Sequence, residues 1–167
     1  DRPMTTDSVF AIFSTTKALT GTCAMQLVEE GRIRLDDPVG KYVPEIDQLQ
    51  VLEGFDASGQ PLTRAPRRPI TINDLMLHTS GLCYEFFSAD DLKYRGAKGI
   101  PTVVTCNFDS IRTVLLHEPG AAWTYGVNID WLGRIVEQQR GQRGDRIGRH
   151  AGQQGHDQRR DRLHLRW

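Results

Sequence analysis

An abrupt change in composition after Gln138 limits how much of the chain can build a hydrophobic core. Of the 167 residues, those from 138 to 167 contain eight Arg against three Asp, a charge of +5 within a net charge of zero. Arg, Gln, Gly and His dominate this tail, and such a mixture buries too little apolar surface to offset the entropy lost on ordering. We therefore predict a partial domain over residues 1–137 and a tail, residues 138–167, that is disordered or derived from a frameshift.

Regularly spaced apolar residues predict several amphipathic helices before the tail. The clearest helix runs from Ser14 to about Glu30, and Gly31 ends it because glycine readily adopts the left-handed conformation that closes a helix. The same spacing predicts shorter helices over residues 70–77 and 111–116 and another that begins near Asn128.

Two segments lack a sustained apolar period and are predicted to be irregular. Prolines and glycines recur through residues 53–69, which we interpret as a surface loop without a core element. Residues 84–110 mix Gly, Lys, Asp and aromatic side chains, which indicates a loop-rich cover with one short helix.

Composition excludes several classes of protein. With 38% hydrophobic and 25% charged residues the chain is typical of a globular domain, and no apolar run is long enough to cross a bilayer. Cys23, Cys83 and Cys106 are odd in number and far apart, so we expect buried small side chains and no disulfide framework. His78 and His117 belong to no metal-ligand cluster, and neither a metal nor a cofactor is predicted.

The two ends of the chain leave its compartment and oligomeric state open. The sequence begins at Asp1 without an initiator methionine or a signal peptide, and we expect upstream sequence to be missing. Cytoplasmic and periplasmic or secreted locations are both compatible with this start. The arginines of the tail are dispersed without an aromatic platform, so we expect no specific nucleic-acid partner.

Ser14 and Lys17 are the main candidates for catalysis. Three residues apart at the start of a helix, their side chains share a face, so Lys17 can reach the Ser14 hydroxyl. A lysine activates a serine as its base only when burial or positive charge lowers its pKa enough to leave it neutral. The helix amino terminus favours the oxyanion that forms on an attacked carbonyl. Alone, the pattern fits a capping serine and an exposed lysine better.

The context of this pair resembles the serine beta-lactamase family, which includes class C beta-lactamases, related carboxylesterases and D,D-peptidases. The similar segments, in the family's order, are the nucleophile helix at residues 13–20, the following turn at 31–39, residues 70–82 with His78-Thr79-Ser80-Gly81, and a tyrosine loop at 118–131. The resemblance covers about residues 8–137. It implies an α/β, beta-lactamase/transpeptidase-like fold, here mainly its helical region, with the N- and C-terminal sheet strands largely missing.

The tyrosine loop supplies a third candidate residue. In the family a tyrosine of a Tyr-x-Asn motif faces the serine and lysine and moves protons, and the resemblance implies this role for Tyr125. Val127 stands where the family has an asparagine that helps to hold a lactam amide, and Asn128 follows one residue later. Asn128 is either a substrate-binding residue or a cap for the next helix. Val127 therefore favours ester hydrolysis over lactam hydrolysis.

The family's third motif, a Lys or His two residues before a Gly on a strand that lines the site, has no copy in this chain. A Gly-x-Ser-x-Gly elbow is also absent, which favours the Lys and Tyr mechanism over a Ser-His-Asp triad. The sequence predicts a serine hydrolase that acts on a small-molecule ester or amide through an acyl-enzyme on Ser14. The alternatives are a beta-lactamase or D,D-peptidase and, in another class, a non-catalytic truncated remnant or binding module.

Overall fold

The computed structural model describes residues 3–148 of the chain, with side chains as far as Gly141. Its α-helices and strands are α1 (Thr16–Glu29), β1 (Val51–Phe55), β2 (Pro61–Arg64), α2 (Ile72–Met76), α3 (Ala89–Lys98) and α4 (Asn128–Gly148). Short 3₁₀ helices join them: η1 (Phe13–Thr15), η2 (Val39–Lys41), η3 (Pro44–Gln48), η4 (Glu85–Phe87), η5 (Val103–Thr105) and η6 (Phe108–Ile111). The described part of the chain is thus mostly helical, as predicted, and it also contains one two-stranded sheet.

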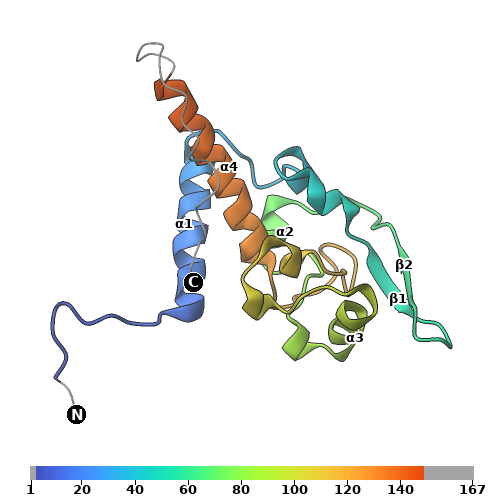
Figure 1. Cartoon of the computed structure of the whole chain (residues 1–167). Helices are drawn as coiled ribbons and strands as arrows, with labels where there is room; N and C mark the ends of the chain where they lie inside the picture. Colours follow the sequence, from blue (N-terminus) through green and yellow to red (C-terminus); the bar gives the residue numbers. More distant parts are fainter. Residues whose placement is uncertain (1–2, 149–167) are drawn as a thin grey trace.

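The two longest helices, α1 and α4, pack side by side, and the other elements lie to one side of this pair (Figure 1). The α4 helix continues to Gly148, so residues 138–148 of the predicted tail are helical in this structure. Contacts with the first part of the chain hold this extension, because Arg32 donates to the Gln139 carbonyl and Arg140 donates to Gln26 Oε1 at 2.6 Å. The rest of the predicted tail, residues 149–167, lies outside the described residues.

Strands β1 and β2 form an antiparallel hairpin where the sequence predicted a surface loop over residues 53–69, so the prediction of a loop is wrong. None of residues 53–69 is buried, which agrees with the absence of a core element there. Leu52 pairs with Thr63, and the register shifts before Gly54. On its other side β1 meets a later segment, because the Leu52 N–H donates to the Leu115 carbonyl at 2.8 Å. Glycine at a bulge and proline at a strand end concealed the strand pattern in the sequence.

η6 ends at Ile111 and residues 112–116 form no helix, so the helix predicted over 111–116 is also wrong. Val51 and Leu115 form an isolated parallel bridge, and Val114 and Leu115 are fully buried. A short apolar run that is buried on both sides does not distinguish a strand from a helix by its period.

The segment from 84 to 110 contains the one α-helix that was predicted, α3. Ser88 caps it by accepting from the Asp91 N–H at 3.2 Å, and Gly99 closes it at a φ of +67°. Asp91 and Arg95 form an ion pair of 2.7 Å that is almost wholly buried. This helix therefore rests on a buried charged pair rather than on an apolar stripe.

A capping box starts α2 and fixes the turn that follows it. The Thr71 hydroxyl accepts from the Asp74 N–H, and the Asp74 carboxylate accepts from the Thr71 N–H at 2.9 Å. Arg68 donates two hydrogen bonds to the same carboxylate, at 2.7 and 2.9 Å. Burial opposes the charged carboxylate, but the hydrogen bonds from Arg68 and Thr71 outweigh it and lower the pKa of Asp74.

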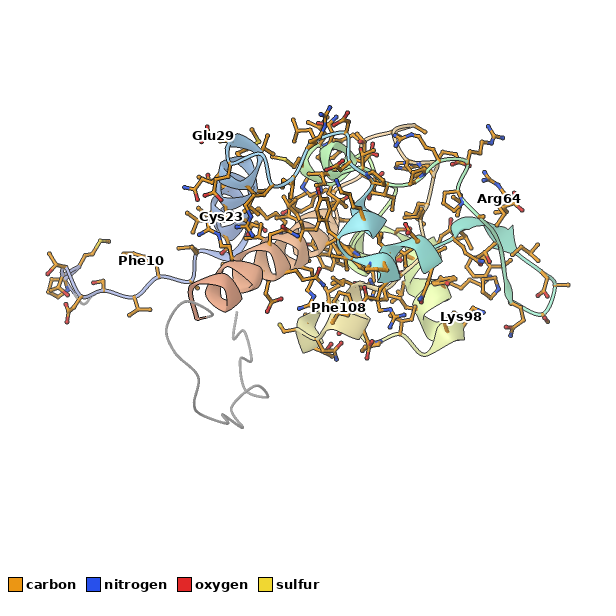
Figure 2. The ribbon with its side chains drawn as sticks, turned by 90° about the horizontal axis from the view of Figure 1, so that it is seen from above. Phe10, Cys23, Glu29, Arg64, Lys98 and Phe108 are labelled. Carbon is orange, nitrogen blue, oxygen red and sulfur yellow. The ribbon has the colours of Figure 1, made fainter. Side chains whose placement is uncertain are left out.

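The hydrophobic core lies between the helix pair and the elements beside it. Its fully buried large members include Leu27, Ile33, Ile72, Leu75, Leu82, Leu115, Trp131, Leu132 and Ile135. In contrast, Figure 2 shows Phe10 on an N-terminal arm that extends away from the body.

Cys83 is buried as expected, whereas Cys106 is exposed. Within residues 3–148 no helix is long and apolar enough to cross a membrane.

Candidate active site

Ser14 lies in the 3₁₀ turn η1 that leads directly into α1, so it stands at the amino terminus of a helix of 14 residues. Its side chain is exposed, and the preceding residue, Phe13, has a left-handed φ of +42°. The dipole of α1 favours negative charge near its amino terminus. The nucleophile predicted from the sequence is therefore accessible and lies in a favourable field.

Tyr125 meets Ser14 although 111 residues separate them in the chain. The Tyr125 hydroxyl donates to Ser14 Oγ at 2.9 Å. Two backbone features hold the tyrosine loop in this place. The Thr124 N–H donates to the His78 carbonyl at 2.8 Å, and Gly126 lies so close to residue 83 that a Cβ there would be 2.5 Å from the Cys83 Cα. The fold thus brings together two of the three predicted catalytic residues by direct contact.

Lys17 is half-buried between two tyrosine rings, with its Nζ 5.3 Å from the centroid of Tyr125 and 5.5 Å from that of Tyr84. Burial alone lowers the pKa of Lys17. A hydrogen bond with Tyr84 and the charges of Tyr84, Asp130 and Tyr125 outweigh burial, and the pKa of Lys17 is raised. A raised pKa favours the ammonium form of Lys17, whereas a lysine that acts as the base for Ser14 must be neutral.

Tyr84 and Asp130 are site residues that the sequence analysis did not identify. Asp130 Oδ2 is buried without a hydrogen-bond partner, and burial raises the pKa of this carboxyl although the charge of Lys17 opposes the rise. Burial and the charge of Asp130 also raise the pKa of Tyr84. In the sequence, Asp130 is indistinguishable from an acidic residue in the first turn of any helix. Tyr84 begins the segment that lacks a periodic pattern.

Asn128 binds the protein itself and leaves no polar atom for a substrate. The side chain is fully buried, and its Oδ1 accepts from the Ser80 hydroxyl at 2.5 Å. Its Nδ2 lies 3.0 Å from His78 Nδ1 and 3.3 Å from the carbonyls of Leu82 and Thr124. The prediction of a substrate contact is therefore corrected, because Asn128 ties the start of α4 to the turn after α2.

Both histidines considered as metal ligands are engaged in hydrogen bonds. Burial and the charge of Lys17 lower the pKa of His78, so its neutral ring can accept from Asn128. His117 Nδ1 lies 2.9 Å from the Glu118 carbonyl and its Nε2 2.8 Å from the Thr124 hydroxyl. Among the described residues no group of three or more His, Cys, Asp or Glu side chains could hold a metal ion.

Comparisons with known proteins assign the chain to a family. The family model described as beta-lactamase matches residues 1–153. The chain belongs to the beta-lactamase family. The acyltransferase mokF of Monascus pilosus is 39% identical over 140 residues, which are 83% of this chain and 34% of that protein. The lovastatin esterase of Penicillium rubens is 35% identical over 138 residues, 81% of this chain and 35% of the esterase.

A solved structure supports the same fold for this beta-lactamase-family chain. Unliganded simvastatin synthase from Aspergillus terreus superimposes with a TM-score of 0.75 at 34% identity, covering 83% of this chain and 36% of that one. The beta-lactamase/transpeptidase-like fold predicted from the sequence is therefore confirmed. The chain spans about a third of the length of the curated relatives that it matches, which agrees with the expected truncation.

Proposed function

We propose that this chain carries the nucleophile, the proton-transfer groups and part of the substrate site of a serine hydrolase or acyltransferase. The observation that carries the proposal is the 2.9 Å hydrogen bond between Tyr125 Oη and Ser14 Oγ at the start of α1. A nucleophile and a proton-transfer group within hydrogen-bond reach, next to a cation, is the arrangement that covalent catalysis by serine requires. The substrate class is a small-molecule ester.

The chemistry follows from the charges around Ser14. Tyr125 first loses its phenolic proton to solvent, and the Lys17 ammonium beside its ring offsets the negative charge of the tyrosinate. Ser14 Oγ then attacks the ester carbonyl carbon as its proton passes to the tyrosinate oxygen. The tetrahedral intermediate expels the alcohol, which takes the proton from Tyr125. Water or a second alcohol then attacks the acyl group on Ser14, and the same residues move the proton in reverse.

Two buried side chains favour an ester over a lactam. Val127 is fully buried, so its apolar side chain offers nothing to a substrate amide. Asn128, the nearest amide side chain in the loop, is consumed by bonds within the protein. The relatives described above are named an acyltransferase and an esterase, which supports water or an alcohol as the acceptor.

The test is covalent labelling of the folded 167-residue chain with a fluorophosphonate, followed by intact mass and peptide mapping. We expect one adduct on the peptide that contains Ser14, no adduct in Ser14→Ala, and roughly 100-fold slower labelling in Tyr125→Phe. Ser58→Ala, in the hairpin turn, is the matched control and keeps the native rate. Folded protein that gains no adduct contradicts the proposal and favours a non-catalytic remnant. Hydrolysis of nitrocefin in preference to nitrophenyl butyrate contradicts the ester assignment.

A further inference from the structure

Five aromatic side chains form a connected group around the tyrosine that contacts the nucleophile. We call this group the aromatic wall; its members are Tyr84, Phe86, Phe87, Trp123 and Tyr125. Tyr125 is its centre, with ring centroids 5.5 Å from Tyr84, 6.2 Å from Phe87 and 6.3 Å from Trp123. Phe86 lies 4.9 Å from Tyr84 and 4.7 Å from Phe87.

Three members of the wall are open to solvent beside Ser14. Phe86, Phe87 and Trp123 expose 62%, 64% and 67% of their surface. Exposed large aromatic rings in contact with one another are rare on soluble proteins unless they bind something. Because the wall is continuous with Tyr125, and Tyr125 is bonded to Ser14, a molecule lying on it would present a group to the nucleophile.

Polar contacts of Glu85 hold η4, the turn that carries two rings of the wall. Phe86 and Phe87 belong to η4, whose first residue, Glu85, is buried. Glu85 Oε1 accepts from the Val103 N–H at 2.9 Å, and Glu85 Oε2 lies 3.6 Å from the buried Arg95. A surface fixed in this way binds a ligand without first losing conformational freedom.

We propose that the aromatic wall binds a hydrocarbon group of the ester, of about four carbons or more, next to the carbonyl that Ser14 attacks. This inference rests on the proposed function and adds the substrate class. Lys17 contacts the wall, and its ammonium is already engaged with Tyr84 and Tyr125. The exposed faces of Phe86, Phe87 and Trp123 are apolar, so a hydrocarbon fits them better than a phosphate.

Labelling rates at Ser14 with three fluorophosphonate probes test the inference. Two probes carry an ethyl or a hexyl group bonded directly to phosphorus, and this group occupies the place of the acyl chain. The third probe carries its hexyl group on the ester oxygen, in the place of the alcohol. We expect native protein to react with one hexyl probe at least about tenfold faster than with the ethyl probe, since each buried methylene adds to binding. Which hexyl probe is faster distinguishes an acyl from an alcohol subsite.

Two variants connect this preference to the wall. Phe86→Ala and Phe87→Ala are each expected to reduce the hexyl-to-ethyl ratio at least about threefold, because each removes one exposed ring. The control is Phe10→Ala, which removes a ring of similar exposure, 60%, from the N-terminal arm and keeps the ratio. Labelling of Ser14 with a ratio near one, or with a ratio that neither variant changes, overturns the inference and leaves the proposed function standing.

A binding measurement covers the case in which Ser14 does not react. The Ser14→Ala protein is titrated with methyl hexanoate or methyl acetate, and its tryptophan fluorescence is recorded. The same titration of a Ser14→Ala, Trp123→Phe protein is subtracted, and the difference is the signal of Trp123. We expect a saturable change with the hexanoate at lower concentration than with the acetate, and a weaker response after Phe87→Ala. Absence of saturable hexanoate binding overturns the inference even where the labelling experiment has already rejected the proposed function.

Discussion

At the scale of single residues, the charge of Lys17 decides how Ser14 can be activated. The lysine lies between two tyrosines with Asp130 nearby, and this surrounding raises the pKa of its ammonium although burial opposes the rise. A charged lysine cannot remove the Ser14 proton. In the proposed mechanism it stabilises instead the tyrosinate form of Tyr125, whose Oη lies within hydrogen-bond distance of Ser14 Oγ.

Substitution of Lys17 separates these two roles. If positive charge is what the site needs, Lys17→Arg keeps it and reduces the rate of fluorophosphonate labelling by about tenfold or less. Lys17→Met keeps the length but removes the charge, and we expect a loss of roughly 100-fold or more. Circular dichroism confirms that both variants are folded. Equal, near-complete loss in both variants would show that Lys17 must become neutral, and the ammonium role would be wrong.

The sequence predicted Ser14, Lys17 and Tyr125 because each belongs to a motif with a chemical reason. It could not predict the state of Lys17, since that state depends on Tyr84 and Asp130, which come from other elements and become its neighbours only in the folded chain. Asn128 illustrates the same limit. Its residue type suits a substrate contact, but its burial among Ser80, His78 and Leu82 gives it a structural role.

At the scale of elements, α1 and the tyrosine loop meet because the loop packs closely on the turn after α2. Gly126 has no room for a side chain, since a Cβ would lie 2.5 Å from both the Cys83 Cα and the Leu82 carbonyl oxygen. Those atoms are backbone, so they cannot rotate away. A shift of the loop to relieve the clash would move Tyr125, the neighbour of Gly126, away from Ser14.

Gly126→Ala should therefore destabilise the protein and weaken the site together. We expect a loss of about 1–3 kcal/mol of unfolding free energy, typical of overpacking, and slower labelling of Ser14. The matched control is Gly96→Ala in α3, where a new Cβ meets no atom within 4 Å. That substitution should stabilise the helix by about 0.5–1 kcal/mol. Thermal unfolding followed by circular dichroism measures both, and equal stability of the two variants would refute the packing argument.

Elements with a clear period or cap were predictable, and those defined by distant partners were not. The helices from Ser14 to Glu30, over residues 70–77 and from Asn128 follow from apolar spacing. The β1–β2 hairpin contacts the segment after η6 through Val51 and Leu115, which are 64 positions apart. Local pattern cannot reveal a pairing of this kind, because neither partner has a distinctive signal alone.

At the scale of the whole molecule, the described part of the chain leaves an unusual amount of apolar surface open. Val9, Phe10 and Phe13 on the N-terminal arm expose 97%, 60% and 84% of their surface. On α1, Leu19 exposes 59% and Met25 38%. These residues lie on the N-terminal arm and along α1. A chain that spans about a third of its relatives' length therefore combines a core between α1 and α4 with exposed apolar side chains on α1 and the arm.

Such side chains should make the chain self-associate, at roughly micromolar concentrations and above, because exposed contiguous apolar surface drives association. Sedimentation velocity over a range of concentrations should show a rising mean mass, and Leu19→Glu should shift the rise to higher concentration without lowering the thermal unfolding midpoint. Leu62→Glu is the matched control, since Leu62 is similarly exposed, 50%, but lies on the β2 strand away from α1. If both substitutions act equally, association is not specific to the α1 face. A native chain that stays monomeric throughout contradicts the prediction.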